Sequence, residues 1–208
     1  CEAGDFTFAG ADAGSFAVSS CATSGDDLQL TVTGGPSDTT NVTITLAYTA
    51  SNGTASSLDD SAGSAVADIS ATAVTDGAAP RSTGTQSYKD TDLDGKVDRV
   101  DITFSEDIAI DECEAGDYTI GGADAGSLAV SACATSGDDL RLTMTGGASD
   151  DTSLTLVFSY SQSAGTASSL DDSSGNYAVS ITTESVSDGA APVAISAEYL
   201  DTNTNGTV

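Results

Sequence analysis

Aspartates at regular spacing are the strongest chemical signal in this sequence. They occupy five positions between residues 90 and 101, in the run DTDLDGKVDRVD. Carboxylates at loop positions 1, 3 and 5 converge when a glycine at position 6 permits a sharp turn, and the carbonyl at position 7 completes one side of an oxygen cage. Calcium prefers such hard oxygen ligands, and clustered carboxylates without a cation repel one another. The run therefore predicts a calcium site, whose candidate ligands are Asp90, Asp92, Asp94, the Lys96 carbonyl, Asp98 and Asp101.

Two residues compete to close this cage. Position 12 is a bidentate glutamate in helix–loop–helix calcium sites, and here it is Asp101. The residues around it alternate as in a strand, which places the loop in a β-hairpin. Asp98 is the other candidate, and strand alternation points Asp101 away from the apolar face of Val100, Ile102 and Phe104. The alternative is a solvated acidic turn that holds no ion.

A shorter version of the loop occurs near the end of the sequence. It contains Asp201, Asn203 and Asn205, followed by Gly206. These side chains offer the same oxygen geometry with less charge, and the sequence stops at Val208 before any closing ligand. We expect this second site to bind calcium weakly, if it binds at all.

Pairs of aspartates form a second acidic pattern, Leu-Asp-Asp-Ser-x-Gly. It contains Asp59 and Asp60 in one place and Asp171 and Asp172 in another. Paired aspartates before a glycine are common in turns, and we favour that interpretation. The alternative is that acids near a domain junction share a cation and stiffen the chain.

The charge balance excludes several kinds of partner. The sequence has 32 acidic and five basic residues, no histidine, and a net charge of −27. Such a field repels phosphate backbones and anionic lipid heads, so we expect neither nucleic-acid binding nor membrane insertion. No window approaches the ~18 apolar residues of a membrane span. The natural partners of this chain are cations.

An internal repeat sets the domain organisation. Residues 1–35 recur at 113–147 with only seven differences, an offset of 112 residues. The segment DGAAP recurs at 76–80 and 188–192, and its Gly and Pro mark a boundary. A repeat of this size is a domain rather than a solenoid coil. We expect a partial repeat at 1–75 that lacks its first strands, a complete repeat at 76–187 and the opening of a third at 188–208.

Short alternating segments indicate an all-β fold of tandem immunoglobulin-like β-sandwiches, with about seven strands each. The expected strands of the complete repeat lie near residues 81–88, 97–105, 117–121, 127–133, 139–145, 153–161 and 176–184. Because the partial repeat lacks the strand equivalent to 97–105, we expect it to be completed by a preceding segment or by a neighbouring subunit.

The four cysteines form two pairs with the same spacing. Cys1 and Cys21 in the first repeat correspond to Cys113 and Cys133 in the second. Regular pairing in a polar, repetitive chain predicts two local disulfides, formed in an oxidising compartment outside the cell. Three Asn-x-Thr triplets, at Asn41, Asn52 and Asn205, fit the N-glycosylation pattern, so glycans are further candidate partners.

Several short motifs follow one another in the complete repeat. DGAAP precedes a strand that ends in DITFSE (101–106), which is followed by DYTI (117–120), DLRLTM (139–144) and LDDSSGN (170–176). This order resembles the bacterial immunoglobulin-like repeats of S-layer and large cell-surface proteins. The resemblance implies a spacer or lattice role on a microbial surface. The cysteine pairs and the acidic loop are not general to that family, so the disulfide and calcium predictions rest on the residues themselves.

Three classes of function are compared on these observations. The leading hypothesis is a non-catalytic extracellular module that calcium rigidifies within a rod, filament, sheath or surface layer, with neighbouring repeats or copies of the same protein as partners. The alternative is an adhesin that binds a sugar or a protein on another cell. An enzyme is disfavoured because the sequence has no histidine, no Gly-rich phosphate loop and no nucleophile elbow.

Overall fold

A computed structural model describes residues 2–35, 42–50, 58–110, 114–147, 154–162, 170–194, 196–200, 202 and 204. The described residues are all-β, and their only helical segments are two 3₁₀ turns, η1 (Ala3–Asp5) and η2 (Ala115–Asp117). The chain divides into two compact units, Cys1–Ala78 and Ala79–Val208. The division falls inside the DGAAP segment at 76–80. We call these unit 1 and unit 2 and describe each by itself.

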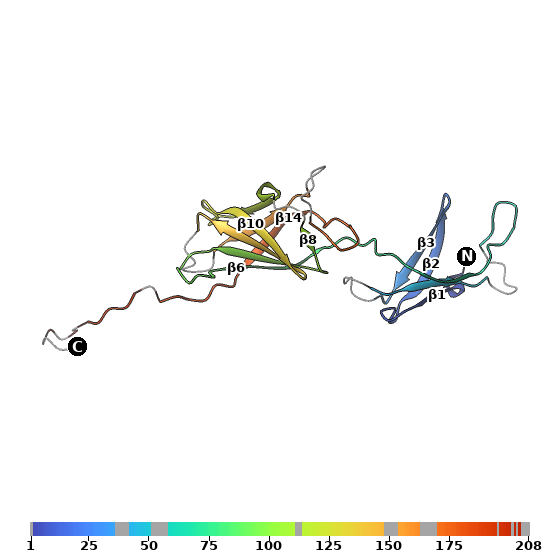
Figure 1. Cartoon of the computed structure of the whole chain (residues 1–208), viewed down its shortest axis with the longest axis horizontal. Coiled ribbons are helices and arrows are strands. Elements are labelled where there is room, and N and C mark those ends of the chain that lie inside the picture. The colour runs from blue at the N-terminus through green and yellow to red at the C-terminus, as the bar shows by residue number, and fades with distance from the viewer. Residues whose placement is uncertain are drawn as a thin grey trace. The chain divides into compact units, whose positions relative to one another are not determined.

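Unit 2 is built on one seven-stranded sheet with the order β10-β11-β7-β6-β14-β12-β9 (Figure 1). Its strands are β6 (Ser82–Lys89), β7 (Arg99–Phe104), β9 (Tyr118–Gly121), β10 (Ala129–Ser136), β11 (Asp139–Thr145), β12 (Leu156–Tyr160) and β14 (Ile181–Asp188). All neighbours in the sheet are antiparallel except β6 and β14, which are parallel. A separate two-stranded ribbon joins β8 (Ala109–Ile110) to β13 (Leu170–Asp171).

The core of unit 2 follows from strand alternation. Val100, Ile102 and Phe104 on β7 are buried, and so are Leu140 and Leu142 on the neighbouring strand β11. These side chains belong to one apolar cluster with the buried residues of β6, β9, β12 and β14. Because side chains from both halves of the sheet meet in a single core, the sheet must curl around it, as in β-sandwiches and barrels.

The expected last strand of the repeat, at 176–184, is shifted in the structure. Strand β14 begins only at Ile181 and continues to Asp188. Tyr177 and Val179, which alternate with Ile181 in that expected strand as core residues would, are 55% and 45% exposed, whereas Ala178 between them is buried. The cause is the turn before them, because Ala178 N–H donates to the Leu170 carbonyl and Val179 N–H to that of Pro80. The other expected strands are present, with ends displaced by a few residues.

Unit 1 contains two separate sheets. One has the order β1-β4-β5 and the other pairs β2 with β3. Their bounds are β1 (Phe6–Ala9), β2 (Ala17–Ser24), β3 (Asp27–Thr33), β4 (Thr45–Tyr48) and β5 (Ile69–Ala73). At the offset of 112 residues these strands correspond to β9, β10, β11, β12 and β14 of unit 2. The strands that correspond to β6 and β7 are not part of unit 1.

Candidate metal centre

The acidic loop lies between two strands at the centre of the sheet order of unit 2. Strands β6 and β7 are antiparallel, with Lys89 opposite Arg99, so the loop leaves and re-enters the sheet at one place. The Asp98 N–H donates to the Lys89 carbonyl at 3.0 Å, and the Met144 N–H donates to the Asp98 carbonyl at 2.7 Å. The end of the loop is therefore fixed to both β6 and the end of β11.

Asp90 organises the first half of the loop. Its side chain is buried, and its two oxygens accept N–H groups from Leu93 at 2.7 Å, Gly95 at 2.8 Å and Asp94 at 3.3 Å. The chain turns sharply here, with left-handed backbone at Leu93 (φ 62°) and Gly95 (φ 81°). Burial alone would raise the pKa of the Asp90 carboxyl, but these three donors outweigh it and hold the pKa below its ordinary value.

Asp98 closes the loop from the other side. Both of its oxygens accept the Thr91 N–H at 3.0 Å, and one also accepts the Thr91 hydroxyl at 2.5 Å. The Asp92 N–H donates to the same carboxylate at 3.2 Å. As a result, one carboxylate oxygen from each of Asp90, Asp92 and Asp98 lies within 4.8 Å of the other two. Three of the predicted ligands are thus brought together.

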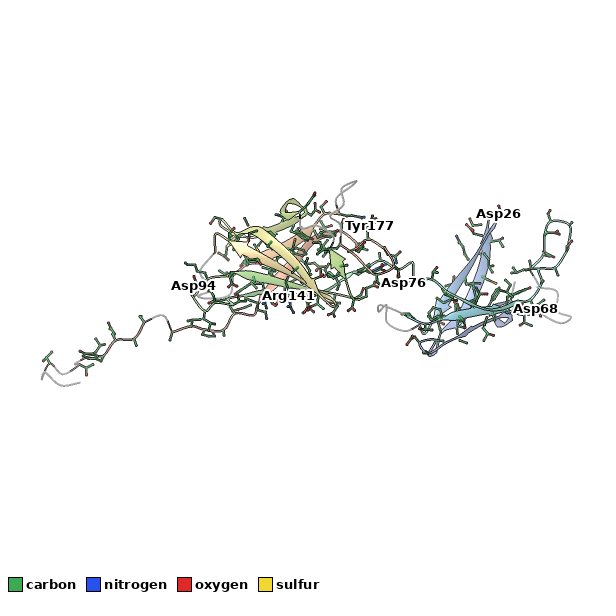
Figure 2. All side chains as sticks on the ribbon, viewed as in Figure 1. Asp26, Asp68, Asp76, Asp94, Arg141 and Tyr177 are labelled. Atoms are coloured by element: carbon green, nitrogen blue, oxygen red, sulfur yellow. The ribbon has the colours of Figure 1, made fainter. Side chains whose placement is uncertain are left out.

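The other predicted ligands lie outside this trio. Asp94, labelled in Figure 2, forms an ion pair with Lys96 at 3.5 Å, and both side chains are well exposed. Asp101 is held by Arg99, whose Nε lies 2.8 Å from Asp101 Oδ1 and whose Nη2 donates to Oδ2 at 2.9 Å. Between the two candidates for closing the cage, the geometry therefore favours Asp98. Asp201, Asn203 and Asn205 lie outside the described residues.

Asp90 and Asp92 keep oxygen lone pairs for a hard cation, whereas Asp98 would bind one by giving up part of its hydrogen bonding to Thr91 or Asp92. An ionised carboxylate has about four lone-pair sites. Asp90 accepts three hydrogen bonds and Asp92 accepts one, from the Asp94 N–H, so oxygen lone pairs are left for a metal. Three carboxylates so close together repel one another in the absence of a counter-charge, and the repulsion is relieved by a divalent ion.

Two further carboxylates, both buried, lie close together elsewhere in unit 2. Glu106 and Asp172 are 3% and 4% exposed, and their carboxylate oxygens lie within 4.8 Å of each other. The turn interpretation of Asp172 is correct at the same time, because its Oδ1 accepts the Ser174 and Asn176 N–H groups at 2.8 Å. Glu106 is not among the predicted site residues; its only sequence signal is an acid two positions after Phe104, where the core strand ends.

The cysteines are described only in part. The described cysteines, Cys21 and Cys133, are both disulfide-bonded, and neither is a free thiol. Cys1 and Cys113 lie outside the described residues, so the pairing of Cys1 with Cys21 and of Cys113 with Cys133 stays a prediction. Asn41, Asn52 and Asn205, the three candidate glycosylation sites, also lie outside them.

Comparisons with protein-family models, with curated proteins and with solved structures found no match to this chain. In the part of the chain that the structure describes, no helix has the length and apolar character needed to span a membrane.

Proposed function

We propose that this chain is a non-catalytic, calcium-rigidified structural repeat of an extracellular rod, filament, sheath or surface layer. The observation that carries the proposal is the trio of Asp90, Asp92 and Asp98, whose carboxylate oxygens lie within 4.8 Å of one another in a turn already closed by hydrogen bonds. Oxygen ligands of this kind are what calcium prefers. Asp94, the Lys96 carbonyl and water would complete the coordination.

Calcium would stiffen unit 2 because of where the loop lies. The loop joins β6 to β7, which occupy the middle of the seven-stranded order, and its last residue is bonded to β11 through Met144. An ion held by Asp90 and Asp98 ties the end of β6 to the start of β7. A ligand that binds only the folded state stabilises it by mass action, so calcium should oppose unfolding of the whole sheet.

The repeat supports a structural role. Two units that share five equivalent strands follow each other at an offset of 112 residues, which is typical of arrays of domains rather than of a single catalytic body. The seven strands of the main sheet in the complete repeat fit the immunoglobulin-like sandwich that the short motifs resemble. Disulfides at Cys21 and Cys133 favour an oxidising compartment outside the cell.

The alternative role is adhesion, which usually needs an exposed aromatic or apolar surface. In the folded part of unit 2, Tyr177 (labelled in Figure 2) and Val179 are two such exposed side chains, two positions apart. A patch of this size is small for a ligand-binding face. We therefore favour the structural role over an adhesin that binds a sugar or a protein on another cell.

Thermal unfolding of the full chain with calcium, with magnesium and with a chelator tests the proposal. We expect calcium to raise the melting temperature of unit 2 and magnesium to raise it less, since magnesium demands stricter octahedral geometry. Asp92→Asn should remove most of the calcium effect. Asp26→Asn is the matched control, because Asp26 (labelled in Figure 2) belongs to the turn between β2 and β3 of unit 1 and is not part of the acidic loop. A calcium effect of equal size in both variants would contradict the proposal.

A further inference from the structure

Unit 1 has a gap where unit 2 has two strands. Removal of β7 and β6 from the order β10-β11-β7-β6-β14-β12-β9 leaves β10-β11 and β14-β12-β9. These two pieces correspond, strand for strand, to the β2-β3 and β5-β4-β1 sheets of unit 1. Unit 1 is therefore the same sheet with its two central strands missing. The gap has one edge on β3 and the other on β5.

The strands that remain are arranged as in unit 2. The Tyr48 hydroxyl accepts the Leu58 N–H at 3.0 Å, and the equivalent Tyr160 hydroxyl accepts the Leu170 N–H at 3.2 Å. The β2–β3 hairpin has the same register as β10–β11, including a bulge at the same position. Unit 1 thus keeps the local structure of the repeat, and only the contribution of the missing strands differs.

Apolar side chains along the gap are exposed in unit 1 and buried in unit 2. Ile69 is 46% exposed, whereas its equivalent Ile181 is 7% exposed. Val74 is 42% exposed, and its equivalent Val186 only 5%. On the other edge, Leu28 on β3 is half-buried, although its equivalent on β11 is completely buried. These apolar side chains are the surface that strands equivalent to β6 and β7 would cover.

A hollow of ≈ 250 Å³ opens at this place in unit 1. Its walls are formed mainly by apolar side chains from β1, β3, β4 and β5 and from the segment after β5: Phe6, Leu28, Leu46, Tyr48, Ile69 and Val74. In unit 2 the equivalents of these six residues belong to one buried cluster with side chains of β6 and β7, of which Tyr88, Val100, Ile102 and Phe104 are at most 1% exposed.

The net charge of the β6–β7 hairpin suits a position next to unit 1. Residues 1–78 contain no lysine or arginine, whereas four of the five basic residues of the chain lie between Arg81 and Arg99. Residues 81–105 carry four basic and five acidic side chains, a net charge of 4 − 5 = −1. A hairpin of this sequence is nearly neutral and adds little repulsion to the acidic unit 1.

We propose that the gap between β3 and β5 is a docking site for a β-hairpin with the sequence pattern of residues 82–104, supplied by another repeat of this same kind. Its second strand pairs with β3 as β7 pairs with β11, which places its Ile102 equivalent opposite Leu28 and its Val100 equivalent opposite Leu30. Main-chain hydrogen bonds at both open edges supply affinity, and the apolar side chains supply specificity.

The chain contains a second segment with the sequence pattern of β6. Residues 193–200 follow the second DGAAP segment, as β6 follows the first. Tyr199 corresponds to Tyr88 and is 80% exposed, although Tyr88 is completely buried; the adjacent Leu200 is 64% exposed. Apolar side chains are thus exposed both in this segment, at Tyr199 and Leu200, and along the gap of unit 1. This is the complementarity expected of successive repeats in an array.

The test is an extended chain in which a second copy of residues 76–112 is placed directly before Cys1. Because residue 113 corresponds to residue 1, this addition gives unit 1 the same spacing as the complete repeat of unit 2. We expect amide hydrogen exchange in β3 and β5 to slow by more than about tenfold relative to the unextended chain. The matched control carries Val100→Asp and Ile102→Asp in the added copy only, and it should give no slowing.

Three results would overturn the proposal. The first is unchanged exchange in β3 and β5 of the extended chain, together with no slowing when a synthetic peptide of residues 81–105 is added to the unextended chain. The second is exchange in the unextended chain that is already as slow in β3 as in β11. The third is self-association that is equally strong in the unextended and the extended chain. The surface responsible for it would then not be the gap between β3 and β5. This inference rests on the array of repeats in the proposed function but not on calcium binding. The same measurements in chelator therefore separate a failure of hairpin docking from a failure of calcium binding.

Discussion

The Asp98 carboxylate accepts the backbone N–H of Thr91 through both of its oxygens, each at 3.0 Å, across seven positions of the chain. This bond closes the loop after β6 onto the first residues of β7. It also turns the Asp98 side chain toward Asp90 and Asp92, whereas the Asp101 side chain is held by Arg99. The bond therefore favours Asp98 over Asp101 as the residue that closes the cation cage.

Replacement of the two candidate closing residues should give opposite results. Asp98→Ala should abolish most of the calcium-induced rise in melting temperature, because it removes a carboxylate from the trio. In chelator it should also cost about 1 kcal/mol, since the Thr91 donors lose their acceptor. Asp101→Ala should leave the calcium effect intact and lose only a partly exposed ion pair. A calcium effect that is lost in Asp101→Ala and kept in Asp98→Ala would reverse the assignment.

Asp90 should make unit 2 sensitive to acid in the absence of calcium. The pKa of its carboxyl is held below the ordinary value of 3.8 by backbone donors that outweigh burial. Because the folded-state pKa is depressed, the stabilisation is fully present above the unfolded pKa and is lost as the pH falls through the folded one. Urea unfolding in chelator should show Asp90→Asn less stable than the wild type at about pH 6, with the difference shrinking as the pH falls below 3.8. A constant difference over that range would show that the carboxylate charge is not the cause.

Two leucines at equivalent positions of the two units, Leu140 and Leu28, should contribute differently to stability. Leu140 is completely buried between β7 and β10, and its equivalent Leu28 borders the gap of unit 1. Leu140→Ala should destabilise unit 2 by about 2–5 kcal/mol through lost burial and a residual cavity. Leu28→Ala should cost unit 1 much less. Hydrogen exchange resolved by residue separates the two units, and equal losses would argue against an uncovered gap.

The disulfide prediction is local pairing, Cys1 with Cys21 and Cys113 with Cys133. Each bridge closes a loop of about twenty residues, which is worth about 3 kcal/mol on the loop-entropy model. Peptide mapping without reduction should recover these two linked pairs, and reduction should lower the melting temperature of unit 2. Recovery of a Cys1–Cys113 link, or of free thiols, would contradict the pairing.

The sequence was sufficient to predict the strands whose alternation is strong. Strand β11 occupies residues 139–145 as expected, with Leu140, Leu142 and Met144 buried. The last strand was misplaced because Tyr177, Val179 and Ile181 alternate as well as any core strand does. Asp172 decides the outcome, since its hydrogen bonds to Ser174 and Asn176 hold a turn that displaces the strand toward Asp188.

The candidate site was predictable in composition but not in detail. The spacing of Asp90, Asp92 and Gly95 was enough to expect a turn with convergent oxygens. The choice between Asp98 and Asp101 was not predictable, because it depends on the local ion pair with Arg99, which strand parity does not reveal. Glu106 was missed for a related reason: its proximity to Asp172 joins residues 66 positions apart, and only the folded chain brings them together.

The most direct test of the central claim is isothermal titration calorimetry of calcium into the full chain and into Asp92→Ala. The account predicts a saturable calcium heat in the wild type that is lost in the variant, while the variant keeps its strand content by circular dichroism. Asp92 is the informative position because it belongs to the trio yet accepts only one hydrogen bond within the loop, from Asp94. Calcium heats that are equal in the two proteins would show that the acidic loop is a solvated turn and not a metal site.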